Sequence, residues 1–163
     1  MSLNLSIYDG VWDLQDYDSD NLEEWMKKMG IPWAKRKIGK SLKRTFTFKV
    51  DPEKPTTNFF IGSKTKVSNK ERNIVIDEPQ PDVSVEGRDM MSVFTIKNGN
   101  LVNVDTWNDD KGNKKEGSYT FTVDGNGLLC CAFDYWVWEF CTFFFITNLN
   151  FHNLYLQIIS HTT

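Results

Sequence analysis

Short strand-like segments separated by turn residues fill the chain from residue 45 to residue 133, and this spacing is its strongest constraint on the fold. The turns include Asp51-Pro52 and Asn98-Gly99-Asn100, which are typical connectors between antiparallel strands. Short strands at intervals of roughly eight to twelve residues favour a β-sandwich or an up-and-down barrel over a parallel sheet. We expect strands at 45–50, 57–63, 73–77, 82–86, 90–97, 101–107, 119–123 and 128–133.

The segment before these strands combines one further strand with a short helix. Residues 7–17 alternate loosely, with Trp12 and Leu14 on one face, and predict the first strand. Asp20 and Glu23 have the spacing of a capping box, so we expect a helix to start here, and Gly30 supplies its left-handed stop. Apolar residues recur at helical spacing within it, at Leu22, Trp25, Met26 and Met29.

A second helix is expected to begin near Pro32, which suits the first turn of a helix because that turn needs no N–H from it. This helix should end before Gly39 and turn Ile31, Ala34 and Ile38 toward the core, with its cations outward. A β-sandwich offers no reason for two helices between its first and second strands, whereas the open end of a barrel needs a cover. The order of the elements therefore favours the barrel.

Length and composition indicate one globular domain. The chain has 163 residues, of which 40% are hydrophobic and 25% charged, an ordinary globular balance. Residues 1–6 carry no basic side chain and acidic residues follow, so we expect no secretory signal. Cys130, Cys131 and Cys141 fit neither a zinc site nor a disulfide framework and are expected to be reduced. We therefore expect a cytoplasmic protein, with the nucleus as a second location.

Basic residues are concentrated in the two predicted helices. All 19 Lys and Arg residues lie at or before Lys115, and residues 22–44 hold eight of them against two acids, Glu23 and Glu24. A solvated helix face is the ordinary explanation of such a patch. The functional one is attraction to an anionic membrane, which is worth roughly 1 kcal/mol per well-placed cation. We expect transient membrane contact through Lys27, Lys28, Lys35, Arg36 and Lys37.

Two segments resemble one known family. Residues 21–36, with Met29-Gly30-Ile31 between the helices, resemble the helical lid of the intracellular lipid-binding proteins, specifically the fatty-acid-binding type within the calycin superfamily. Asn98-Gly99-Asn100, followed by Trp107, resembles a later hairpin of that family. The resemblance spans roughly residues 8–133. The first strand contains a Gly-x-Trp pattern, Gly10-Val11-Trp12, which secreted lipocalins share. Lipocalins, however, would be expected to show a signal peptide, paired cysteines and no helical pair.

The resemblance implies a mainly β fold, an up-and-down antiparallel ten-stranded β-barrel of the clam type with a two-helix lid at 22–39 between strands one and two. Residues 1–133 would form this lipid-binding barrel, and 134–163 an atypical segment of which part supplies the last strand. It further implies a monomeric carrier, not an enzyme, that transports a long-chain fatty acid or a similar hydrophobic ligand inside the barrel behind a portal gated by the lid. It implies no cofactor, no metal and no nucleic-acid partner.

Five residues are the candidates for contact with the ligand. By position in the resemblance, Leu22, Met26 and Ile31 face the ligand near the portal, Trp107 ends a strand beside the cavity, and Arg88 matches a portal arginine of some members. For the four apolar residues of the first helix the alternative is core packing, and we expect it for at least two of them because a lid must be anchored. For Arg88 the alternative is an ordinary surface residue.

The resemblance fails at the carboxylate receptor. Members of the family typically hold the ligand carboxylate with an Arg on a late strand and an Arg-x-Tyr pair on the last one, since a buried carboxylate needs charge-assisted hydrogen bonds. The first of these positions falls on Thr120, and the pair falls on Phe143 and Phe145. The alternative function is therefore a barrel that binds a neutral hydrophobe or serves as an interaction module.

Residues 134–163 differ from the rest of the chain, with nine aromatic residues from Tyr135 to Tyr155 and no Lys or Arg. One explanation is that residues 135–145 supply the closing strand and the rest is an appendage. A second is a membrane-seeking segment, although Asp134 and Glu139 make spanning costly. A third is an alternative end that replaces the family's usual last segment, which would leave an open edge.

Catalysis has no support in the sequence. His152 and His161 are the chain's histidines and both lie in the atypical segment. No Ser or Cys has a base at a recognisable spacing, and no glycine loop has phosphate-binding spacing.

Overall fold

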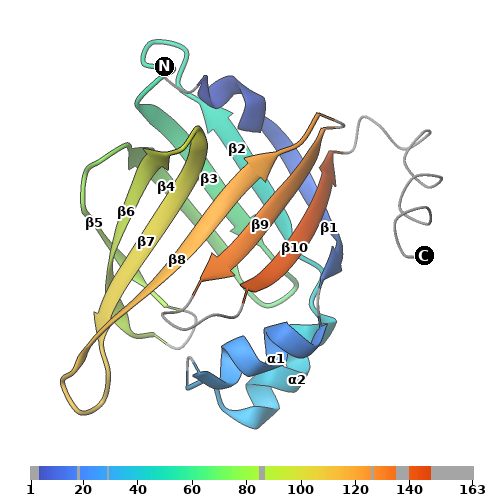
Figure 1. Cartoon of the computed structure of the whole chain (residues 1–163), viewed down its shortest axis with the longest axis vertical. Helices are drawn as coiled ribbons and strands as arrows, with labels where there is room; N and C mark the ends of the chain where they lie inside the picture. The colour runs from blue at the N-terminus through green and yellow to red at the C-terminus, as the bar shows by residue number, and fades with distance from the viewer. Residues whose placement is uncertain are drawn as a thin grey trace.

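One antiparallel sheet of ten strands accounts for most of the residues that the structure, a computed structural model, describes: 4–17, 19–28, 30–84, 87–125, 127–134 and 140–147 (Figure 1). A 3₁₀ helix, η1, precedes the sheet, and two α-helices follow its first strand. The elements are η1 Leu5–Tyr8, β1 Gly10–Tyr17, α1 Ser19–Lys28, α2 Trp33–Ser41, β2 Thr45–Val50, β3 Asn58–Lys64, β4 Asn69–Val75, β5 Gln80–Val83, β6 Asp89–Lys97, β7 Asn100–Asn108, β8 Lys114–Val123, β9 Leu128–Asp134 and β10 Phe140–Thr147.

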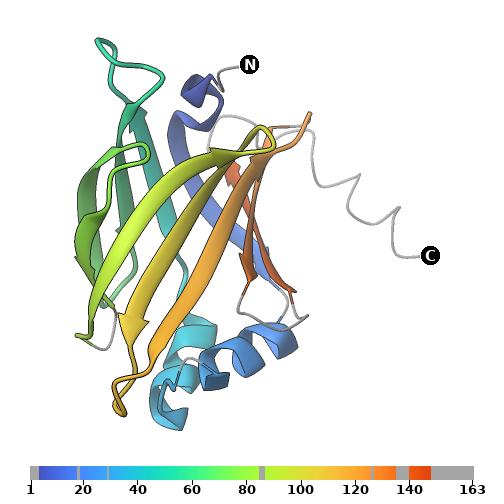
Figure 2. The ribbon, with the colours of Figure 1, turned by 60° about the vertical axis from the view of Figure 1, so that its left-hand side comes forward.

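The strand order shows how the sheet rolls up. Strands lie in the order β4-β3-β2-β1-β10-β9-β8-β7-β6-β5, so β10 joins the two ends of the meander by pairing with β1. Within the described residues β4 and β5 remain as edges without a backbone ladder between them, and we call this place the β4–β5 seam. Figures 1 and 2 show α1 and α2 across one end of the rolled sheet. The predicted ten-stranded barrel with a two-helix lid is confirmed.

The N-terminal turn lies at the end opposite the lid (Figure 1). The prediction of a strand from residue 7 is wrong at its start, because Leu5–Tyr8 forms η1 and β1 begins at Gly10. Tyr8 gives the reason: its hydroxyl donates to the Phe121 carbonyl at 2.9 Å and accepts from the Leu101 amide at 3.0 Å. These bonds turn the chain before β1 across the barrel toward β7 and β8.

The strands β4, β5 and β8 have other bounds than predicted, and charged residues obscured the starts of β4 and β8. β4 begins four residues earlier than predicted, at Asn69, and β5 covers 80–83 rather than 82–86. Lys70 and Arg72 do not suggest a strand, but on an edge strand they reach across the seam to Asp82. β8 likewise begins at Lys114 rather than 119, because its polar first half pairs with β7.

The second helix is oriented differently from the prediction. It includes Gly39, and no residue of α2 is buried. Ala34 is exposed and Ile38 is 54% exposed, so the prediction that they face the core is wrong. The reason lies in α1: a Cβ on Gly39 would meet the Met26 Sδ at 3.1 Å, so α2 turns its small residue, not its apolar ones, to its neighbour.

The strand between β1 and β9 comes from residues 134–163, the atypical and aromatic-rich segment. β10 pairs with β9 from Phe140 opposite Asp134 to Ile146 opposite Leu128. This pairing corresponds to the explanation in which the aromatic segment supplies the closing strand. Residues 135–139 and 148–163 lie outside the described residues, and so does Met29.

Candidate functional site

The inner face of the sheet is aromatic at its centre. Side chains alternate between the two faces of a strand, so the buried positions of each strand mark this face. Phe46, Phe48, Phe59, Phe94 and Phe121 come from four strands and belong to one buried cluster. Neighbouring rings stand 5.4 to 6.5 Å apart between centroids, in stacked, tilted and edge-to-face arrangements. Such pairs add roughly 0.5–1.5 kcal/mol each beyond burial.

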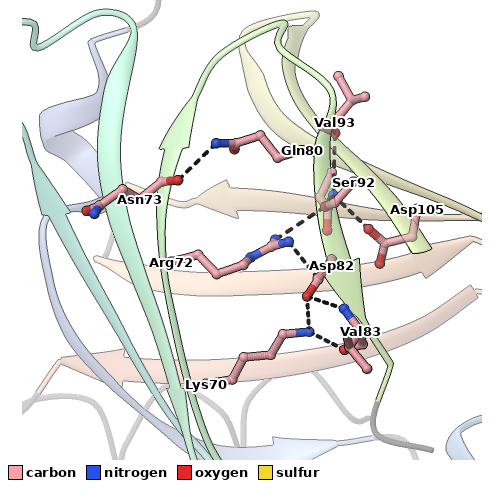
Figure 3. A network of polar contacts seen from close by, with 10 residues as sticks. Lys70, Arg72, Asn73, Gln80, Asp82, Val83, Ser92, Val93 and Asp105 are labelled. Atoms are coloured by element: carbon pink, nitrogen blue, oxygen red, sulfur yellow. Dashed lines mark hydrogen bonds and ion pairs between the residues drawn. The ribbon is translucent and has the colours of Figure 1, made fainter. Parts of the chain in front are cut away.

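A polar network joins the edges at the β4–β5 seam (Figure 3). Arg72 Nη1 lies 2.5 Å from Asp82 Oδ2, and Arg72 Nη2 donates to Ser92 Oγ at 3.2 Å. Lys70 Nζ lies 2.5 Å from Asp82 Oδ1 and donates to the Val83 carbonyl at 2.6 Å. Side chains thus connect the strands where the backbone ladder is missing.

The network continues along the inner face through Ser92. Asn103 Nδ2 donates to Ser92 Oγ at 2.7 Å and to Asp105 Oδ1 at 3.2 Å, and all three residues are buried. Burial raises the pKa of the Asp105 carboxyl, although hydrogen bonds from Ser92 and Asn103 act against this change. Arg72 also stands over the ring of Phe94, 5.6 Å from its centroid. The polar network therefore adjoins the aromatic cluster at Arg72 and Phe94.

The candidate ligand residues of the lid lie between helix and barrel. Leu22 and Met26 of α1 are 6% and 5% exposed and belong to the buried cluster. Ile31, in the connection to α2, is half-buried and packs against the same cluster. Burial at this place fits both anchoring of the lid and contact with a ligand beneath it. The side chain of Trp25 lies outside the described part.

The lid cations differ in their surroundings. Arg36 Nη1 donates to the Ile31 carbonyl at 2.7 Å, and Lys27 lies 3.7 Å from Glu24. Lys37 stands over the ring of Trp33, 4.2 Å from its centroid, while Lys35 is exposed. The side chain of Lys28 lies outside the described part. Arg36 thus holds the lid together, and Lys35 and Lys37 remain at its surface.

Trp107 and Arg88 lie at the rim of the barrel. Trp107 is 5% exposed and, with Met90 and Lys114, lines an open pocket of about 250 Å³ at the start of β6 and β8. Arg88 lies in the β5–β6 turn, where its amide donates to Ser84 Oγ at 3.0 Å. Its side chain is half-buried. The two residues come from neighbouring parts of the sheet.

The positions matched to the family receptor fall on different faces. Thr120 lies opposite Val102 and Ala132, out of phase with buried Phe121, and so occupies the outer face. A shift of one residue exchanges the two faces of a strand, which explains why the sequence match put an outward residue, Thr120, at a receptor position. In register, Phe143 lies opposite Cys131 and Phe145 opposite Leu129, both of which are buried. The side chains of Phe143 and Phe145 lie outside the described part.

Sequence reasoning missed the inward-facing polar groups, among them Arg44 and Tyr119. Arg44 was counted among the lid cations, yet it precedes β2 by one residue and shares the face of Phe46. Burial lowers the pKa of its guanidinium, against electrostatic interactions with Tyr119 and Cys131 that raise it. Burial likewise raises the pKa of the Tyr119 hydroxyl. Two-residue spacing from Phe46 and Phe121 is the signal that could have identified both.

The residues that the structure describes contain no group of three or more His, Cys, Asp or Glu side chains placed to hold a metal ion. None of their helices is long and apolar enough to cross a bilayer.

Solved structures share this architecture. Fatty-acid-binding protein 1 of Echinococcus granulosus has a TM-score of 0.74 with 19% sequence identity, over 88% of this chain and 98% of that one. The fatty acid binding protein of Schistosoma mansoni, solved in complex with arachidonic acid, also has a TM-score of 0.74, with 21% identity over 88% and 98% of the two chains. At these identities the likeness establishes the fold.

Sequence comparison extends the likeness beyond the fold. No protein-family model matches the chain. Fatty acid-binding protein 12 of Mus musculus, however, is 32% identical over 98 residues, which cover 60% of this chain and 70% of the relative. Together with the rolled ten-stranded sheet and its two-helix cover, this identity shows that the chain belongs to the fatty-acid-binding protein family.

Proposed function

We propose that this protein is a non-enzymatic carrier that encloses a long-chain fatty acid or a similar hydrophobic ligand inside its barrel. The observation that supports the proposal is the apolar inner face of the rolled sheet, with the phenylalanine cluster at its centre. Leu14 and Ile31 pack against the buried cluster near the lid yet keep part of their surface accessible. An apolar inner face of this kind favours an apolar guest. Arachidonic acid in the Schistosoma mansoni relative supports the same ligand class.

The energetics of an acyl chain suit such an interior. Each buried methylene contributes about 0.8 kcal/mol, so about ten of them would supply roughly 8 kcal/mol before the costs of binding. Micromolar affinity corresponds to about 8 kcal/mol. Chain burial alone therefore accounts for much of a useful affinity, and any head-group contact adds to it.

We further propose that α2 is the moving part of the portal. α1 is anchored through Leu22 and Met26, whereas α2 buries no residue. α2 is held chiefly by polar contacts, the ion pair of Lys40 with Glu23 and the bond from Arg36 to the Ile31 carbonyl. Contacts of this kind are weaker than apolar burial and are replaced by water on opening.

The exposed surface of α2 suits an anionic membrane. Trp33 and Ile38 are 59% and 54% exposed, beside Lys35 and Lys37. Aromatic and aliphatic groups enter the interface while lysines contact the head groups. We propose that the carrier loads and unloads its ligand by transient contact through this surface.

A neutral hydrophobe is the second candidate ligand. The register of β10 puts Phe143 and Phe145 in phase with the buried residues of β9, where the family typically has a polar pair. Displacement of the neutral dye Nile red tests whether the protein is a carrier at all. Oleate and methyl oleate should both displace the dye at about one molecule per chain. Failure of both lipids to bind would contradict a carrier function and favour the alternative, a barrel that serves as an interaction module.

A further inference from the structure

Among the residues that the structure describes, Arg44 is an inward-facing cation with no carboxylate at ion-pair distance. Its backbone carbonyl accepts from the Leu14 amide at 2.9 Å, one step beyond the last β1–β2 pair, Asp13 with Thr45. In an antiparallel ladder this step places Arg44 opposite Leu14, and Leu14 packs against the buried cluster. The Arg44 side chain therefore points to the interior near the lid, three residues after α2.

Tyr119 faces the same space from the far wall. It lies opposite Asn103 in the β7–β8 register, and Asn103 is buried within the inner polar network. Arg44 lies within electrostatic range of Tyr119 and of the buried Cys131, which belong to β8 and β9. The Arg44 guanidinium, one residue before β2, and the Tyr119 phenol of β8 therefore face the same interior from opposite sides of the barrel.

Both groups combine partial accessibility with strong desolvation. Arg44 and Tyr119 each keep intermediate accessible surface, yet burial shifts the pKa of each away from its charged form. Outer-surface groups would be hydrated and would show no such shift. This combination is typical of side chains that line an enclosed space.

The other inward-facing arginine is already occupied. Arg72 is paired with Asp82 and also donates to Ser92. Within the part of the chain that the structure describes, no carboxylate lies at ion-pair distance from Arg44. A desolvated cation without a counter-charge is costly, and an anionic ligand would remove that cost.

We propose that Arg44, with Tyr119 beside it, forms the carboxylate receptor of this barrel, near the lid rather than on the last strand. Resting on the proposed carrier function, this assigns an anionic head group near the portal and an acyl chain running toward the phenylalanine cluster. It also explains how the chain can bind an acid although Phe143 and Phe145 stand at the pair's usual positions. A guanidinium with a hydroxyl is the donor set that a carboxylate requires.

The test compares the two lipids on three proteins by Nile red displacement. Wild-type protein should prefer oleate to methyl oleate by about tenfold or more, the size expected for a charge-assisted hydrogen bond. Arg44→Gln should abolish this preference by weakening oleate while methyl oleate binds as before. The matched control is Lys43→Gln, which removes the same charge from the exposed neighbouring residue and should keep the preference.

Each outcome separates the two proposals. Equal binding of both lipids by the wild type, or a preserved preference in Arg44→Gln, would contradict the proposed carboxylate receptor but not the proposed carrier function. Absence of binding by the wild type overturns both. If Arg44→Gln does not fold, the carboxyl signal of [1-13C]oleate bound to wild-type protein and to Tyr119→Phe decides. An unshifted signal and equal affinity in these two proteins would contradict the receptor.

Discussion

Arg72 of β4 and Asp82 of β5 form a 2.5 Å ion pair across the β4–β5 seam, where no backbone hydrogen bonds join the described strands. Asp82 also forms an ion pair with Lys70, so one carboxylate balances two cations from the opposite edge. The carboxylate is 7% exposed and the Arg72 side chain 18%. Desolvation strengthens the attraction within such a pair, but loss of either partner then destabilises the fold strongly because the other charge stays buried.

Asp82→Asn should therefore destabilise the fold, by about 2 kcal/mol, because Arg72 and Lys70 would keep their charges without a counter-charge. Urea unfolding followed by tryptophan fluorescence measures the change. Asp110→Asn, in an exposed turn, is the control and should change stability by less than about 0.5 kcal/mol. Equal stability of both variants would show that the seam does not depend on this ion pair.

Tyr8→Phe should cost about 1–3 kcal/mol, since it deletes the hydroxyl that bridges the Phe121 carbonyl and the Leu101 amide. The ring itself stays buried, so the loss reports the hydrogen bonds rather than packing. Thermal or urea unfolding detects it. Ile7→Ala, on the exposed side of the same 3₁₀ turn, should be nearly neutral, and a larger loss there than at Tyr8 would contradict the assignment.

Asp105→Asn should stabilise the protein near neutral pH. The folded-state pKa of Asp105 is raised, so the folded state binds the proton more tightly than the unfolded chain. The free energy of unfolding therefore falls as the pH rises above the ordinary pKa of an aspartate. The amide cannot titrate and can still accept from Asn103. Urea midpoints compared from about pH 4.5 to about pH 7.5 should show a gain that shrinks toward acid. A gain independent of pH would point to packing instead.

Reversal of charge on Lys35 and Lys37 to Glu should slow ligand transfer to anionic vesicles by about tenfold, because two attractive cations become repulsive. Transfer of a fluorescent fatty acid to phosphatidylserine-containing vesicles gives the rate. The control reverses Lys54 and Lys97, exposed residues in the β2–β3 connection and at the end of β6. Similar rates for both double variants, or no dependence on vesicle charge, would argue against contact through α2.

Prediction from the sequence succeeded where local chemistry decides conformation. Turn residues such as Asn98 and Gly99, both with positive φ, fix a hairpin wherever the strands lie, so β6 and β7 were placed to within one residue. The strand at 45–50 was predicted with its observed bounds. Prediction failed at β4, where Lys70 and Arg72 gain their role only from a carboxylate on another strand.

The candidate site was predicted less well than the fold. The apolar face of the first helix was recognised from the spacing of its residues, and Leu22 and Met26 are buried, while their contact with a ligand stays a prediction. Thr120 was misplaced because the face of a strand residue depends on register to within one position. Arg44 was read as a surface cation, since sequence alone does not tell where the lid ends and β2 begins.

The sequence by itself determined that the chain forms a meander of short antiparallel strands with a basic two-helix insert after the first. Those properties reside in neighbouring residues: turns, caps and periodicity. Only the tertiary structure decided which side chains meet, because β1 and β10, or Arg72 and Asp82, approach through the rolling of the sheet. The same rolling turns Arg44 away from the lid surface and toward Tyr119.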